Sequence, residues 1–128
     1  MKLGYTIIYV PDVQQAVEFY ERCFGLACRS LVETGDYAEM ETGTTALSFA
    51  AETLISQMID SYHRNSLQAP PAGIEIVFVT DDVQSAYEQA VQNGAVVVAE
   101  PALKPWGQTV SYVRDLNGVL VEIASEMS

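Results

Sequence analysis

The sequence predicts an α+β protein made of two similar βαβββ modules in tandem. The second half of the chain repeats the first at an offset of 70 positions, so that Asp12-Val13-Gln14 aligns with Asp82-Val83-Gln84. A strand-like run, an aspartate, a helical pattern and a glycine follow one another in the same order in both halves. Three further strand-like runs then complete each half.

Each module opens with a strand and a helix. Residues 5–10 and 75–80 are rich in β-branched and aromatic side chains, which favour strands. Asp12 and Asp82 follow these runs and are predicted to cap the next helices through their carboxylates, rather than to act as general bases. Each helix is predicted from apolar residues at helical spacing, and each is predicted to end near a glycine. The apolar residues are Val13, Ala16, Val17 and Tyr20, then Val83, Ala86, Tyr87 and Ala90, and the glycines are Gly25 and Gly94.

Three more strands are predicted in each module. Glu41-Thr42-Gly43-Thr44 and Asp115-Leu116-Asn117-Gly118 separate the last two strands of each set, and Asn-Gly is among the strongest hairpin signals. The expected strands are 27–33, 36–41 and 45–51 in the first module, and 95–99, 109–114 and 119–124 in the second.

The chain is predicted to form a single domain over residues 1–128. Module one covers about 1–51 and module two about 74–126. The linker between them, about 52–73, contains a helical pattern over 54–62 and ends in Pro70-Pro71.

Composition excludes several classes of function. Hydrophobic residues make up 49 % of the chain, enough for a core, and the net charge of −11 repels nucleic acid and anionic membranes. No apolar run is long enough to span a bilayer and no signal peptide is recognisable, so we expect a cytoplasmic protein with no membrane or nucleic-acid partner. Cys23 and Cys28 are predicted to be free thiols, and His63, in the linker, is the sole histidine.

These motifs resemble the vicinal oxygen chelate (glyoxalase/bleomycin resistance protein/dioxygenase) superfamily over essentially the whole chain. Ala16-Val17-Glu18-Phe19-Tyr20 and Phe24-Gly25-Leu26 are similar to its first module. The second half of the chain is similar to its second module at Pro105-Trp106-Gly107-Gln108. The most specific motif is Asp115-x-Asn117-Gly118-x-x-x-Glu122. The resemblance implies a curled mixed sheet that forms a cleft, and a homodimer.

Metal-bearing members of this superfamily place one side chain on the first strand and one on the last strand of each module. Carried over residue by residue, these positions are Tyr5, Ser48, Glu75 and Glu122. None is a histidine, so the two imidazoles of a ring-cleaving dioxygenase are missing. Two carboxylates with two hydroxyls suit at most a weakly held hard cation, at Glu75 and Glu122. We therefore expect no cofactor, with a divalent metal as the alternative.

Three functions remain open. The first is a metal-free protein that binds a small molecule in an acidic cleft lined by Tyr5, Ser48, Glu75, Glu122 and Trp106. In that reading the carboxylate pair recognises a cationic or polyhydroxylated ligand. The second is a lactoylglutathione-lyase-like isomerase that uses Glu122 as metal ligand and Glu75 as base. The third is a degenerate, non-catalytic module. Trp106 is either a ligand platform or a structural plug, and Arg114 is predicted to form a local ion pair at its hairpin.

Overall fold

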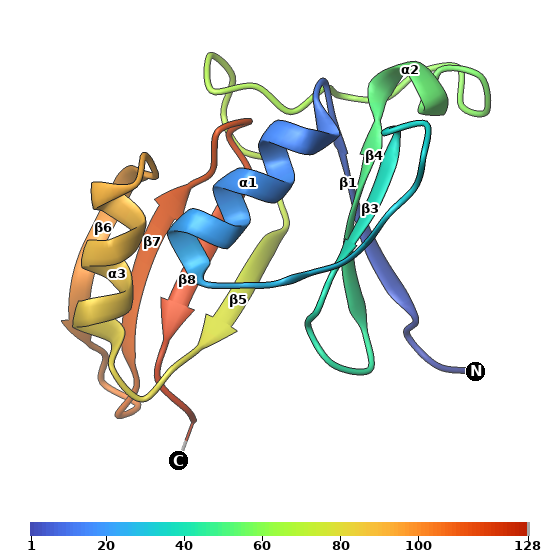
Figure 1. The fold of residues 1–128 in the computed structure, drawn as a ribbon. Coiled ribbons are helices and arrows are strands. Elements are labelled where there is room, and N and C mark those ends of the chain that lie inside the picture. The colour runs from blue at the N-terminus through green and yellow to red at the C-terminus, as the bar shows by residue number, and fades with distance from the viewer. Residues whose placement is uncertain (128) are drawn as a thin grey trace. The chain divides into compact units, whose positions relative to one another are not determined.

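The fold consists of two βαβββ units, as the repeat predicts. The computed structural model describes residues 1–127, and contacts divide the chain into a first unit, Met1–Arg64, and a second unit that begins at Asn65. The first unit contains β1 (Tyr5–Val10), α1 (Val13–Phe24), β2 (Cys28–Leu31), β3 (Tyr37–Met40), β4 (Ala46–Ala51) and α2 (Glu52–Ile55). The second contains β5 (Glu75–Val79), α3 (Val83–Gln92), β6 (Val96–Leu103), β7 (Thr109–Arg114) and β8 (Leu120–Ala124) (Figure 1).

Each unit has one mixed four-stranded sheet with the same topology. The strand order is β1-β4-β3-β2 in the first unit and β5-β8-β7-β6 in the second. The first strand runs parallel to the last strand of its unit, and the other pairs are antiparallel. A parallel pair needs a long crossover, which the helix and the two intervening strands supply. The last strand therefore lies at the centre of each sheet.

The two long helices begin and end where the sequence predicts. Oδ1 of Asp12 accepts the backbone N–H of Gln15, and Oδ1 of Asp82 accepts that of Ser85, both at 3.0 Å. These bonds satisfy amides that the first turn of a helix leaves unpaired. Gly25 ends α1 at a φ of 69°, a left-handed conformation that costs glycine little.

One face of each sheet packs against the helix of its own unit. In the first unit, Phe49 of β4 is fully buried against Tyr20 of α1, with ring centroids 4.9 Å apart. Because strand side chains alternate, Ser48 projects from the opposite face. In the second unit α3 packs on β6, β7 and β8, and Val121 and Ile123 occupy the places equivalent to Leu47 and Phe49. We call the opposite face of each sheet its helix-free face.

Two elements differ from the sequence prediction. The helix expected over 54–62 is the short α2, which ends in tighter turns, with the amide of Met58 bonded to the carbonyl of Ile55. Of its apolar residues Ile55 is buried, whereas Met58 and Ile59 are exposed, so a longer helix would have had no apolar face to bury. Strand β6 runs on to Leu103 instead of ending at residue 99, and its pairing with β7 is interrupted by register shifts. An edge strand with such irregularities tolerates Pro101.

The structure bears on two further predictions, one about the cysteines and one about membrane-spanning helices. Cys23 is buried and Cys28 is half-buried, and neither forms a disulfide bond, as expected. Within residues 1–127 no helix has the length and hydropathy required to cross a membrane.

Candidate functional site

The structure brings Glu75 and Glu122 together on the helix-free face of the second sheet. Strands β5 and β8 pair in parallel, with Glu75 opposite Leu120 and Val77 opposite Glu122. Glu75 and Glu122 are therefore diagonal neighbours on one face. Their side chains hydrogen-bond to each other, although Glu75 is exposed and Glu122 is only 8 % exposed. The sequence prediction of a carboxylate pair thus has a structural counterpart within a single sheet.

The contact between the two carboxyl groups raises the pKa of Glu75. The hydrogen bond to Glu122 raises the pKa of Glu75, and partial burial and the negative charge of Glu122 raise it further. Two carboxyl groups can hydrogen-bond to each other only while one holds a proton. Glu75 therefore keeps its proton to a higher pH than an ordinary glutamate does.

Tyr112 completes this cluster from the other side of Glu122. Strand β7 is antiparallel to β8, and its Tyr112 lies directly opposite Glu122. Burial raises the pKa of the Tyr112 phenol, and so do its hydrogen bond to Glu122 and the charges of Glu122 and Glu75. The O–H of the neutral phenol donates a hydrogen bond to Glu122, so Glu122 lies between two donors, Tyr112 and Glu75. We call Glu75, Tyr112 and Glu122 the acidic cluster.

Apolar side chains flank the acidic cluster on the same face. Val77 and Val79 follow Glu75 on β5 at two-residue spacing and are 45 % and 52 % exposed. A buried, hydrogen-bonded carboxylate beside exposed apolar side chains is a surface that suits a ligand with a polar head and an apolar body.

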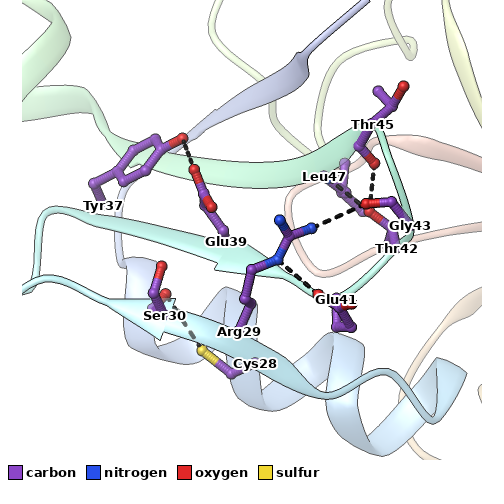
Figure 2. A network of polar contacts seen from close by, with 10 residues as sticks. All are labelled: Cys28, Arg29, Ser30, Tyr37, Glu39, Glu41, Thr42, Gly43, Thr45 and Leu47. Carbon is purple, nitrogen blue, oxygen red and sulfur yellow. Dashed lines mark hydrogen bonds and ion pairs between the residues drawn. The ribbon is translucent and has the colours of Figure 1, made fainter.

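The helix-free face of the first sheet carries a different polar cluster. The hydroxyl of Tyr37 lies 3.0 Å from Oε2 of Glu39 and 3.1 Å from Oγ of the buried Ser48 (Figure 2 shows the contact with Glu39). Burial raises the pKa of Tyr37; the bond with Ser48 opposes this rise and the bond with Glu39 adds to it. Tyr5 is mostly exposed and acts electrostatically on Tyr37. Ser48 is thus committed to a hydrogen bond within its own unit.

Trp106, the remaining predicted site residue, lies in the turn between β6 and β7. Its indole is 61 % exposed, and its Nε1–H donates to Oε1 of Gln108 at 2.9 Å. Tyr112 lies further along β7, three residues beyond Thr109, where the strand begins. At about 3.3 Å per residue this spacing places the Trp106 turn roughly 10 Å along the sheet from the row that contains Glu122.

Arg114 is used differently from the ion pair expected at its hairpin. Its guanidinium donates to four backbone carbonyls, those of Gly118, Ser66, Leu67 and Ala69, at 2.9, 3.1, 3.4 and 2.7 Å. The neighbouring carboxylate of Asp115 accepts the backbone N–H groups of Asn117 and Val119. Both side chains therefore stabilise backbone at this end of the second sheet.

The donor groups do not fit the metal centre that the family resemblance implies. Tyr5 and Ser48 supply neutral hydroxyls, and Glu75 and Glu122 are hydrogen-bonded to each other. Across residues 1–127 no three His, Cys, Asp or Glu side chains gather closely enough to hold a metal ion. Zinc and nickel favour imidazole or thiolate ligands, which are missing from these positions.

The sequence reasoning missed Tyr112, Tyr37 and Glu39. Tyr112 lies opposite Glu122 because five residues, 115–119, separate the paired Arg114 and Leu120. Counting outward from a four-residue turn 115–118 would place Tyr112 opposite Val121 instead, so the turn motif alone does not identify it. Glu39 lies opposite Ser48 because six residues, 41–46, separate the paired Met40 and Leu47, whereas a four-residue turn 41–44 would place Glu39 opposite Ala46. Tyr37 is two residues from Glu39 on the same face, so alternation would have added it.

The raised pKa of Glu75 leads to a prediction about stability. A carboxyl group with a pKa raised by folding contributes stability below its unfolded pKa, and this contribution is lost as the pH rises through the folded value. Glu75→Gln keeps a donor for Glu122 but cannot ionise. We expect the variant to gain stability relative to the wild type as the pH rises from about 4.5 toward 8.

Urea unfolding followed by circular dichroism at several pH values measures this effect, at low protein concentration because the sequence pI is about 4.2. Glu100→Gln is the matched control, since it removes one exposed charge from the same sheet. An equal pH trend in the two variants would show that the effect is only the loss of one negative charge.

Comparisons with known proteins cover nearly the whole chain. It is 25 % identical to lactoylglutathione lyase of Escherichia coli O157:H7 over 98 % of this chain and 93 % of that protein. It is 24 % identical to lactoylglutathione lyase of Neisseria meningitidis serogroup B over 100 % and 93 %.

Solved structures share the fold. A glyoxalase-related enzyme from Fulvimarina pelagi superposes with a TM-score of 0.83 at 16 % identity, over 98 % of this chain and 88 % of that one. TioX from Micromonospora sp. ML1 superposes with a TM-score of 0.71 at 20 % identity, over 98 % of both chains. The family model of the Glyoxalase/Bleomycin resistance protein/Dioxygenase superfamily matches residues 2–123, and the chain therefore belongs to this superfamily.

Proposed function

We propose that this protein binds a small organic cation at Glu122 without the help of a metal ion. One observation carries the proposal: Glu122 is a buried carboxylate, held by Tyr112 and Glu75 on the helix-free face of the second sheet. A carboxylate withdrawn from water interacts more strongly with a cation than an exposed one does.

The surroundings of Glu122 favour a cation with a flat apolar body. An amidinium or guanidinium head pairs with a carboxylate through two parallel hydrogen bonds. The exposed Val77 and Val79 offer contact to the rest of such a ligand. The net charge of −11 favours the encounter with cations over a long range.

Calorimetric titration with benzamidine tests the proposal, because this amidinium has both features. Benzamide, its neutral analogue of the same shape, is the ligand control. We expect benzamidine to bind the wild type and Glu122→Gln to bind it about tenfold or more weakly, since a charged hydrogen bond contributes roughly 1.5–3 kcal/mol. Glu100→Gln, which removes one charge elsewhere, is expected to bind like the wild type. Equal affinity of the wild type for benzamide and benzamidine would refute recognition of the charge.

Metal independence has its own measurement. Elemental analysis of protein purified without chelators is expected to find no tightly held metal at a stoichiometric level. One nickel, zinc or manganese ion per chain would overturn this part of the proposal.

The named relatives favour a second candidate, an isomerase similar to lactoylglutathione lyase. Such an isomerase is expected to turn over the hemithioacetal of methylglyoxal and glutathione in the presence of a divalent metal. This activity should be abolished in Glu122→Gln and strongly reduced in Glu75→Gln. A lack of turnover with nickel, zinc, cobalt and manganese would remove this candidate. If the chain neither turns over this substrate nor gains thermal stability with any cation, the degenerate module remains.

We further propose that the chain is a cytoplasmic homodimer. Ile7 on β1 and Val96, Val97 and Val98 on the edge strand β6 are exposed apolar side chains that association would cover. A monomer in sedimentation at micromolar concentration would contradict the dimer.

A further inference from the structure

A short piece of the linker is attached to the second sheet by one side chain. We call Ser66–Ala69 the linker strap. Its carbonyls at Ser66, Leu67 and Ala69 accept hydrogen bonds from the guanidinium of Arg114, which also donates to the carbonyl of Gly118. The other hydrogen bonds found within the strap are local, such as the amide of Ala69 to the carbonyl of Ser66 at 3.2 Å. Arg114 is thus a major attachment of the strap to the sheet.

Arg114 is a close neighbour of the acidic cluster. It is two residues from Tyr112 on β7, on the same face of the sheet. Leu120 pairs with Arg114 on one side and with Glu75 on the other, so these three residues form one row across the sheet. Tyr112, Glu122 and Val77 form the next row. Side chains on diagonal positions of adjacent strands are about 7–8 Å apart, a gap that an arginine can close.

The guanidinium nevertheless donates to carbonyls and not to these carboxylates. Arginine has five N–H donors in a rigid planar fork, and four bonds to carbonyls occupy most of them. We propose that Arg114 is a positioning residue for cation binding. The linker strap holds its charge away from Glu75 and Glu122 and so leaves the acidic cluster open to a cation from solution. This inference rests on the proposed function.

Two substitutions, Arg114→Lys and Arg114→Met, distinguish the effect of the positive charge at position 114 from the effect of the hydrogen bonds that attach the strap. The compact ammonium of lysine does not reproduce the fork that spans the carbonyls of Gly118, Ser66 and Ala69. In Arg114→Lys we expect the strap to loosen and the freed cation to turn toward Glu122. Arg114→Met loosens the strap equally but brings no cation.

Two measurements on the intact 128-residue chain test the inference. Hydrogen–deuterium exchange is expected to be at least tenfold faster at the strap amides in both variants, with the exchange of β7 and β8 preserved. Benzamidine affinity is expected to fall at least fivefold in Arg114→Lys, whereas Arg114→Met binds at least as tightly as the wild type. Arg29→Lys, at an exposed arginine paired with Glu41 in the first unit, is the control for the change to lysine.

A third variant, at Gly118, disrupts the contact between Arg114 and the linker strap without changing Arg114. A Cβ at position 118 would lie 2.6 Å from Nη2 of Arg114 and 2.6 Å from the carbonyl oxygen of Ser66. Gly118→Ala should therefore separate strap and arginine and weaken benzamidine binding, as Arg114→Lys does.

The possible results distinguish the attachment of the strap, the role of the charge at position 114 and the proposed function. Unchanged strap exchange in both Arg114 variants would overturn the attachment. Faster exchange with equal benzamidine affinity in Arg114→Lys and Arg114→Met would overturn the role of the charge. Failure of the wild type to bind benzamidine would instead refute the proposed function, and with it the role of Arg114 in binding, while exchange would still report on the attachment.

Discussion

Replacing Gly118 with alanine is expected to destabilise the protein by about 2–4 kcal/mol. Gly118 has a φ of 86°, in the left-handed region, where a Cβ costs roughly 1–2 kcal/mol. The added Cβ would also lie 2.6–2.7 Å from the Ser66 carbonyl and the guanidinium of Arg114. Two of these neighbours are backbone atoms, so the strap itself has to move.

Gly35→Ala separates the two causes of this loss. Gly35 has a φ of 75°, but no atom lies within 4 Å of a Cβ built there. Urea unfolding is therefore expected to show a loss of only about 1–2 kcal/mol for Gly35→Ala, from backbone strain alone. If Gly118→Ala and Gly35→Ala lose the same stability, the crowding of the added Cβ against the strap adds nothing to the cost of the left-handed backbone.

Replacing Phe49 with alanine is expected to cost about 3–5 kcal/mol, the usual range for a fully buried aromatic side chain. Phe49 lies at the centre of the first sheet, between Ile8 of β1 and Ala38 of β3, and its ring packs on Tyr20 of α1. Truncation would leave a cavity between helix and sheet that a rigid strand cannot close.

Chemical unfolding measures this loss, and Phe49→Leu is the matched control. Leucine retains most of the apolar contact, so its cost should be about 1–2 kcal/mol. A loss below roughly 1 kcal/mol for Phe49→Ala would mean that α1 is not held to its sheet through this residue.

Much of the fold could be predicted because its signals are local. The caps at Asp12 and Asp82 and the turn at Gly118 each depend on a few consecutive residues. The helix expected over 54–62 failed for the opposite reason. Its local pattern was adequate, but of its apolar residues Met58 and Ile59 are exposed.

The candidate site was predictable only in part. The repeat and the family motif selected Glu75 and Glu122, but neither indicates which other side chains touch them. Tyr112 is ten residues from Glu122 in sequence and reaches it only because the hairpin aligns the two strands. The bonds from Arg114 to Ser66 and Ala69 span still larger separations, and no local pattern encodes them.

By itself, the sequence determined that this protein has two βαβββ units and where their long helices and most of their strands lie. Its resemblance to the superfamily places Glu75 and Glu122 at positions where metal-bearing members carry ligands. The fold follows from periodicity, capping and turn chemistry, which act over a few residues, whereas the site positions are implied by the resemblance. Tertiary structure decided that Tyr112 and Glu75 both hydrogen-bond to Glu122, that Ser48 is bonded to Tyr37, and that Arg114 binds the linker strap. Those contacts depend on strand register and on packing between distant segments, and therefore exist only in the folded chain.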